Sequence, residues 1–367
     1  MSSKDINALL SKLKENGLNV DDLLLHDGTY WKIHESFSRQ YPACRYAKKA
    51  ELVENTYEED GSEVIKEPQF AQMGLQTTYS MKSGSITELS VTGATANEPG
   101  FVHPAEEGKS VLHLIMDAGY CDSSLLRTLH EHGDYFITRL RANSAAVIEE
   151  VTIEGDDFTD MFKGKKLSCR EFRTFREHDR ADIIVRLNDG SRYRAVRFYS
   201  KKEHQCRNFV TNIMNKRITA KMICSIYKIR WQIERLFLDL KSGSNLTGVT
   251  TRVENIIYVM LFASLCAHFL KQLTAGVIAA IENRKSSLYR LSVYSGVWQR
   301  QYLKALFSGD LKNIKQIVND IRDLKGCYEQ VRQSRIKDDS MKTLLSVYKF
   351  LFQSLTTSGT EKVLLEA

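Results

Sequence analysis

The stretch that most constrains the fold of this chain runs from Tyr227 to Lys241 and reads YKIRWQIERLFLDLK. Plotted as a helix at about 100° per residue, its apolar side chains and those just before it form one stripe. That stripe consists of Met222, Ile226, Ile229, Ile233, Leu236 and Leu240. A second row beside it consists of Tyr227, Arg230, Glu234 and Lys241. The pattern predicts a helix with one packed face and an adjacent row of ionisable side chains, ended by a left-handed residue at Gly243.

Taken alone, this polar row is explained more simply as a solvated helix face, because Arg230 and Glu234 stand four residues apart and can pair. The charge around it favours another interpretation. The chain has 367 residues and a net charge of +7, yet residues 191–241 contain 13 Lys and Arg against three acids, a balance of +10. A basic block suits a polyanion, nucleic acid first, although a cationic surface that serves solubility is the alternative.

Two aspartates are associated with predicted strands in the first third of the chain. Leu23 to Leu25 lead into Asp27 and Gly28, so a strand would bring Asp27 to a sheet edge, with Gly28 allowing a turn or a close approach. An Asp-Gly pair is by itself more typical of a hairpin turn. The apolar run 111–116 predicts a central strand, and Asp117 follows it before a helix over 123–132. Ligands bind at such strand ends in open α/β sheets, while a local cap is an equal alternative.

The remaining segments predict a mixed α/β chain that becomes helical towards its C-terminus. Residues 1–20 suggest a short amphipathic helix, residues 75–95 a hairpin, and residues 145–220 mostly strands. The longest apolar run, 256–270, is shorter than the ~20 residues of a membrane helix, so we expect a buried helix and no membrane partner. Seven scattered cysteines and an N-terminus without an apolar signal sequence indicate a reducing cytoplasm.

Three carboxylates thus emerge in three contexts: Asp27 at a strand, Asp117 at a strand end and Glu234 on a helix. Carboxylates suit hard cations such as Mg²⁺ or Mn²⁺. Two such ions about 4 Å apart activate a water or a 3′-hydroxyl and stabilise the leaving oxygen of a phosphodiester. Arg230 and Lys241, which share a helix face with Glu234, would then bind phosphates beside the ions.

At these residues the chain resembles the DDE transposases of the insertion-sequence-four family. Their signature of Tyr, two residues, Arg, three residues, Glu, six residues and Lys is present here as Tyr227, Arg230, Glu234 and Lys241. The LIMDAGY segment around Asp117 is similar to the family's second block, and Asp27-Gly28-Thr29 is similar to its first block. The resemblance covers roughly residues 23–270 and reverses the simpler interpretations of the three acids.

The resemblance implies an α/β fold with an RNase H-like catalytic core, a β-rich insertion and a helical C-terminal region. The expected parts are a short N-terminal helical segment (1–22), the core (23–144 and 218–283), the insertion (145–217) and the C-terminal region (284–367). It also implies hydrolysis of phosphodiester bonds at the ends of an insertion sequence, followed by joining of the 3′-OH ends to target DNA.

By the same resemblance, Asp27, Asp117 and Glu234 are the catalytic residues and hold two Mg²⁺ (or Mn²⁺) ions. Tyr227, Arg230 and Lys241 are expected to contact double-stranded DNA. Arg139 is a weaker candidate for this contact. Trp231 would stack on a base, although its place beside the packed stripe favours a core position. The protein is expected in the bacterial cytoplasm, at the nucleoid when it is bound to DNA. It is expected to act as a homodimer in the synaptic complex.

The chain departs from the family pattern at its front, where only 26 residues precede Asp27. This leaves two alternatives to an active transposase. One is a truncated, inactive remnant that binds DNA without cutting it, and the other is a metal-dependent nuclease without strand transfer. The presence of all three acids favours the active enzyme.

Overall fold

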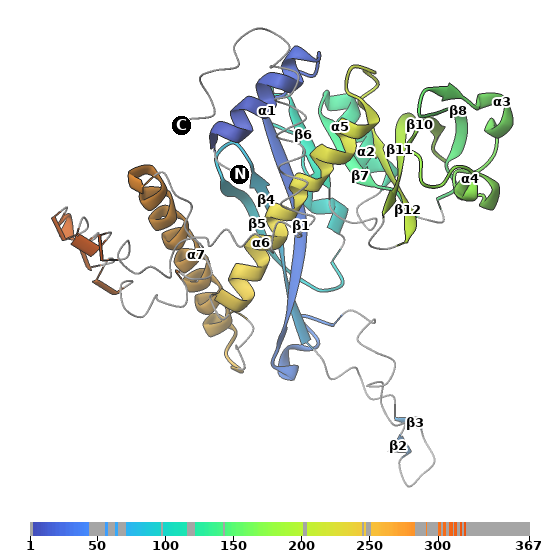
Figure 1. Cartoon of the computed structure of the whole chain (residues 1–367). Coiled ribbons are helices and arrows are strands. Elements are labelled where there is room, and N and C mark those ends of the chain that lie inside the picture. Colours follow the sequence, from blue (N-terminus) through green and yellow to red (C-terminus); the bar gives the residue numbers. More distant parts are fainter. Residues whose placement is uncertain are drawn as a thin grey trace.

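A computed structural model gives the fold (Figure 1). It describes residues 3–43, 56–57, 63–64, 71–96, 98–115, 122–141, 144–200, 204–243, 246, 251–282, 291, 300–301, 304–305, 308–310, 312–313, 316–317 and 319–320. Most of the predicted C-terminal region 284–367 therefore lies outside the described residues, and the boundaries between the predicted parts stay a prediction.

A ten-stranded mixed sheet forms the centre of the molecule, in the order β5-β4-β1-β6-β7-β12-β11-β10-β8-β9 (Figure 1). Its first half consists of β1 (Asp22–Ile33), β4 (Ala71–Ser80), β5 (Ser85–Gly93), β6 (Val111–Ile115) and β7 (Tyr135–Arg139). Strand β4 pairs antiparallel with β1 and β5, whereas β1, β6 and β7 run parallel. Three antiparallel strands followed by two strands parallel to the first confirm the predicted RNase H-like core.

The second half of the sheet is built by the predicted β-rich insertion. It consists of β8 (Val147–Ile153), β9 (Asp156–Asp157), β10 (Ala181–Arg186), β11 (Arg192–Ser200) and β12 (Gln205–Thr211), with α3 (Thr159–Phe162) and α4 (Arg170–Thr174). Strand β12 pairs antiparallel with β7, so these strands continue the core sheet. A separate two-stranded sheet pairs β2 (Thr56–Tyr57) with β3 (Glu63–Val64).

Helices cover the sheet on both faces. They are α1 (Ser3–Glu15), α2 (Ser123–His132), α5 (Ala220–Tyr227), α6 (Trp231–Leu238) and α7 (Glu254–Glu282). The larger apolar cluster joins α1, α5, α6 and α7 to the sheet face that carries Leu23 and Leu25 of β1. Because side chains alternate along a strand, Asp27 lies on this same face. Helix α2 packs against β7 in the second cluster, which continues under the second half of the sheet.

Helix α7 is present, but the expectation of a buried helix holds for one face only. The helix has 29 residues, and several large apolar side chains on it are exposed, among them Val259 (65%), Phe262 (52%) and Leu273 (62%). By length and composition its segment Glu254–Gly276 is able to cross a membrane, a test that the core helix of a soluble protein also passes. The expected absence of a membrane partner therefore stays a prediction.

A buried line of polar side chains crosses the opposite face of the sheet, behind Asp27. His26 Nδ1 lies 3.1 Å from Thr78 Oγ1, and His26 Nε2 lies 2.8 Å from His113 Nδ1. His113 Nε2 in turn lies 3.4 Å from Asp134 Oδ2. These contacts connect β4, β1 and β6 to the residue that precedes β7. They hold together the strands on which the expected site depends.

Asp134 is the charged end of this line. Burial alone would raise the pKa of Asp134, but the neighbouring His113 and hydrogen bonds from the backbone N–H groups of Ala105 and Val111 hold that pKa below its ordinary value. Burial, followed by the neighbouring His113 and His103, lowers the pKa of His26 well below its ordinary value. His26 is therefore neutral at neutral pH, while Asp134 is ionised.

We expect Asp134→Asn to lower the free energy of unfolding by about 2 kcal/mol at neutral pH, the loss of hydrogen bonds to a buried charge. Because the folded pKa lies below the unfolded value of about 3.9, the stabilisation is present above that value and is lost as the pH falls through the folded pKa. Urea unfolding at a series of pH values measures both effects. The difference in the free energy of unfolding between wild type and variant should shrink below about pH 4. A difference that stays constant with pH would contradict the stabilising role of the ionised Asp134 carboxylate.

Candidate active site

The predicted central helix is formed by several consecutive segments that cross the sheet face carrying Asp27 (Figure 1). Helix α5 begins after Thr219, whose hydroxyl accepts a hydrogen bond from the Met222 N–H at 3.3 Å. A 3₁₀ turn, Lys228–Arg230, leads into α6, and a π-helical turn, Asp239–Gly243, follows it. All six residues of the predicted apolar stripe are buried. The helix is confirmed, and Gly243 is the last residue of its π-helical turn; the left-handed conformation expected there stays a prediction.

Asp27 lies in the middle of strand β1 and is half-buried. It pairs with Thr77 of β4, whose buried hydroxyl has no hydrogen-bond partner within the described part of the chain. A Cβ at Gly28 would stand 2.5 Å from Oε1 of Gln76, so glycine leaves the space in which the Gln76 side chain crosses the strand. The hairpin-turn interpretation of Asp27-Gly28 is therefore wrong, and the close approach is confirmed.

The polar row of the helix is assembled around Arg230. Its Nη1 donates to Glu234 Oε1 at 2.8 Å, and its guanidinium lies 5.5 Å from the centre of the Tyr227 ring. Tyr227 is buried and packs against Phe209 of β12, with ring centres 4.2 Å apart. Arg230 is thus fixed by one aromatic ring and one carboxylate, and it orients the Glu234 carboxylate in return.

Lys241 connects this helix to Asp27. Burial lowers the pKa of the Lys241 ammonium, while the Asp27 carboxylate opposes that shift by stabilising the charged form. Helix α6 packs against β1 through the same apolar cluster. The packing of α6 on β1 thus brings the helix that leads to Lys241 close to the strand of Asp27, although the two residues are 214 positions apart in the sequence.

Of the two weaker DNA-contact candidates, Trp231 and Arg139, only Trp231 departs from its preferred placement. The side chain of Trp231 is 45% exposed, so the preferred core position is wrong and the ring is available for stacking. Arg139 ends β7 and pairs with Phe209, the ring that contacts Tyr227, so it lies on the same face of the sheet. The basic block is less exposed than its charge suggested, because Arg194 and Arg197 are buried.

Similarity to known proteins identifies the family of this chain. Residues 19–270 match the family described as Transposase DDE domain. The chain belongs to this family. No solved structure matches the chain.

The names of three relatives agree with this family. A transposase for insertion sequence element IS1151 of Clostridium perfringens is 19% identical over 306 residues, which cover 73% of this chain and 60% of the relative. The inferred transposase y4zB of Sinorhizobium fredii is 26% identical, over 55% of this chain and 53% of the relative. An inferred transposase for insertion sequence element IS4SA of Synechocystis is 22% identical, over 43% of this chain and 40% of the relative. The chain thus spans no more than 60% of the length of these relatives.

Two of the three expected DDE carboxylates, Asp27 and Glu234, belong to the described residues, whereas Asp117 lies outside them. Strand β6 ends at Ile115, which pairs with His26, the neighbour of Asp27. Asp27 and Glu234 offer only carboxylate oxygens, the donors that Mg²⁺ and Mn²⁺ prefer, and the Glu234 side chain is 33% exposed to solvent. Within the described residues no group of three His, Cys, Asp or Glu side chains is arranged to hold a metal. The two described acids thus fit such ions by donor chemistry.

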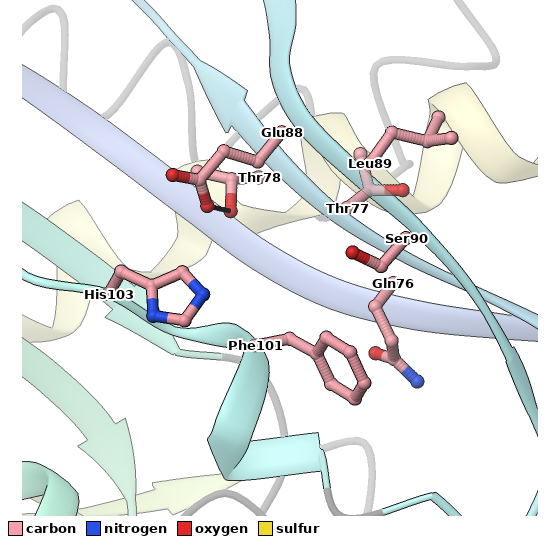
Figure 2. Close-up of a pocket in the computed structure, with 8 residues that line it drawn as sticks. All are labelled: Gln76, Thr77, Thr78, Glu88, Leu89, Ser90, Phe101 and His103. Carbon is pink, nitrogen blue, oxygen red and sulfur yellow. Dashed lines mark hydrogen bonds between the residues drawn. The ribbon is translucent and has the colours of Figure 1, made fainter.

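A cavity of about 300 Å³ lies on the face of the ten-stranded sheet opposite to Asp27 (Figure 2). Glu88 and His103 line it, and Figure 2 shows the hydrogen bond from Thr78 Oγ1 to Glu88, which measures 3.1 Å. Its lining side chains Thr78, Gln76 and Glu88 share the sheet face of His26, opposite to Asp27. The sheet therefore separates this part of the lining from the Asp27 carboxylate.

Proposed function

We propose that this chain is a DNA transposase of the insertion-sequence-four family. It hydrolyses phosphodiester bonds at the ends of an insertion sequence and joins the 3′-OH ends to target DNA. The observation that carries the proposal is the meeting of Asp27, in the middle of the first strand of an RNase H-like sheet, with the helix that bears Glu234 and Lys241. Asp117 follows the end of the adjacent strand β6 by two residues.

In this proposal Asp27, Asp117 and Glu234 hold two Mg²⁺ (or Mn²⁺) ions, which when bound activate a water or a 3′-hydroxyl and neutralise charge on the leaving oxygen. The other residues of the site bind and orient the DNA. Arg230 fixes the Glu234 carboxylate at 2.8 Å. The half-buried ammonium of Lys241 stands beside Asp27, where it is able to bind a phosphate next to the reacting bond.

The remaining contacts extend this surface along the DNA. Trp231 exposes its ring for stacking on a base, and Arg139 lies on the same side of the sheet beside Phe209. Tyr227 is buried, so it would act on the DNA through the Arg230 guanidinium, which lies 5.5 Å from the centre of its ring. We also propose that two copies of the chain act together in a synaptic complex and that the protein works in the bacterial cytoplasm, at the nucleoid when bound to DNA.

Strand joining tests this function. The protein is incubated with Mg²⁺, a supercoiled target plasmid and a duplex that carries the element's own end, taken from the flanking genome and already cut to expose its 3′-OH. Covalent joining of the duplex to the plasmid is the expected result. Nicking without joining would identify a nuclease, and binding without either reaction would identify an inactive remnant; both outcomes would overturn the proposal.

Replacing Trp231 by alanine should weaken binding to an unpaired or distorted element end by about 1–3 kcal/mol, the contribution of one base–aromatic stack. Because the ring is exposed, the free energy of unfolding should change by less than about 0.5 kcal/mol. Fluorescence anisotropy with labelled DNA measures the affinity. Phe262→Ala, which removes a similarly exposed ring from α7, is the matched control and should bind as the wild type does. Equal losses in the two variants would contradict the stacking role.

A further inference from the structure

The helix that carries Glu234 changes its geometry before it reaches Lys241. Residues Asp239–Gly243 form a π-helical turn, a rare element that is frequent at functional sites. In a regular α-helix Lys241, seven residues after Glu234, would lie about 20° from it around the axis. The wider turn gives Lys241 a different direction. Whatever holds this turn therefore determines where the ammonium of Lys241 is placed.

A buried ionic cluster holds the first residue of the turn. Lys271 Nζ donates to both carboxylate oxygens of Asp239, at 2.9 and 2.8 Å, and His268 Nδ1 lies 2.5 Å from Oδ2 of Asp239. The exposed fractions of the three side chains are 9% for Asp239, 1% for His268 and 2% for Lys271. His268 and Lys271 stand three residues apart on α7 and so share one face of that helix.

The Asp239 carboxylate is ionised within this cluster. Burial alone would raise the pKa of Asp239, but the hydrogen bonds from His268 and Lys271 outweigh burial and keep that pKa below its ordinary value. A buried charge that loses its partner is strongly destabilised, so Asp239 cannot leave this position without a large cost. The cluster therefore attaches the turn firmly to α7.

Lys241 follows Asp239 by two residues, within the same turn. Its ammonium is half-buried and interacts with the Asp27 carboxylate of β1. The turn is therefore fixed on one side by α7, and on the other side it presents Lys241 to the strand that carries Asp27. The π-helical turn also packs against α7 as a whole.

We propose that Asp239, His268 and Lys271 are positioning residues that act through Lys241: they set the π-helical turn that places its ammonium beside Asp27. This inference rests on the proposed function, in which Lys241 binds a DNA phosphate. None of the three side chains needs to touch DNA, because all three are buried in the protein.

The test uses the full chain with Asp239→Asn and, as a second route to the same cluster, Lys271→Met. Asp182→Asn is the matched control, since Asp182 also pairs with a buried cation, Arg194, but lies in the second half of the sheet. The position of Lys241 is read without DNA from its ¹³Cε resonance in lysine-labelled protein, assigned with Lys241→Arg. Asp27→Asn shows the shift expected when the ammonium loses its neighbouring carboxylate.

DNA binding supplies the second readout. Lys241→Ala should reduce the slope of log affinity against log salt by about 0.9, the loss of one phosphate contact. Asp239→Asn and Lys271→Met should reduce it equally, and the double variant Asp239→Asn/Lys241→Ala should show no further reduction. Asp182→Asn should keep both the slope and the Lys241 resonance of the wild type.

The two readouts separate the inference from the function on which it rests. A Lys241 resonance unmoved in Asp239→Asn and Lys271→Met, or additive slopes in the double variant, would overturn the positioning role. A resonance that moves in both variants while Lys241→Ala leaves the slope unchanged would support the positioning role and overturn the proposed DNA contact of Lys241. An equal shift of the Lys241 resonance in Asp182→Asn would show that general destabilisation causes the shift, and it would also overturn the proposal.

Discussion

Replacing Glu234 by glutamine should abolish Mg²⁺-dependent nicking of DNA that carries the element's ends, with a rate loss of about 10³-fold or more. The amide has nearly the shape of the carboxylate but carries no charge for a hard cation. It also weakens the 2.8 Å contact with Arg230, which lies on the same helix face. The nicking rate on supercoiled DNA, measured against Mg²⁺ concentration, checks this expectation.

Folding and DNA binding should survive this change. The Glu234 side chain is 33% exposed, and a partly exposed ion pair of this spacing contributes about 1 kcal/mol or less to stability. Glu88→Gln is the matched control, because Glu88 lies on the same sheet but lines the cavity on the opposite face. The control should nick DNA at the rate of the wild type. Nicking by Glu234→Gln, or its loss in Glu88→Gln, would remove Glu234 from the catalytic site.

The central helix was predictable because its signal is local. Six apolar residues at alternating spacings of four and three are sufficient to define the face that packs against β1, and all six are buried. The Arg230–Glu234 pair follows from the same periodicity. Since both features depend only on residues within about five consecutive helical turns, no knowledge of the rest of the chain is needed.

The π-helical turn could not be predicted in this way, because its cause lies on another helix. Asp239 reads as one more polar residue in the periodic pattern, and the partners that hold it are 29 and 32 positions further along the chain. A signal does exist in the sequence. His268 and Lys271 stand three residues apart in a mostly apolar helix, and buried charged side chains need a partner.

The position of Asp27 also depends on residues that are distant in the sequence. The Asp-Gly pair favours a hairpin turn locally, yet both residues lie inside a strand of 12 residues. The glycine is explained by Gln76, which crosses β1 from β4, 48 positions away. In the same way, the strands of the insertion were predictable one by one, while their continuation of the core sheet depends on the pairing of β12 with β7.

Arg194 is the residue whose loss should destabilise the fold most. Its side chain is 2% exposed, and it donates to both oxygens of Asp182 at 2.7 and 2.5 Å. Its Nη1 also lies within reach of three carbonyl oxygens in the loop before α5, at 2.8 to 3.3 Å, those of Ile213, Asn215 and Ile218. Arg194 thus connects the second half of the sheet to the start of the helix that carries the site.

We expect Arg194→Met to lower the free energy of unfolding by about 3 kcal/mol or more, because Asp182 loses its partner and the carbonyl oxygens lose their donor. Arg192→Met is the matched control on the same strand: Arg192 pairs with Glu149 and Glu150, but its side chain is 54% exposed, so its loss should cost less than about 1 kcal/mol. Urea unfolding of both variants measures the difference, and equal costs would contradict it. Because Arg194 is buried, the salt dependence of DNA binding should stay that of the wild type below the unfolding transition, which separates this structural cation from Lys241 at the site.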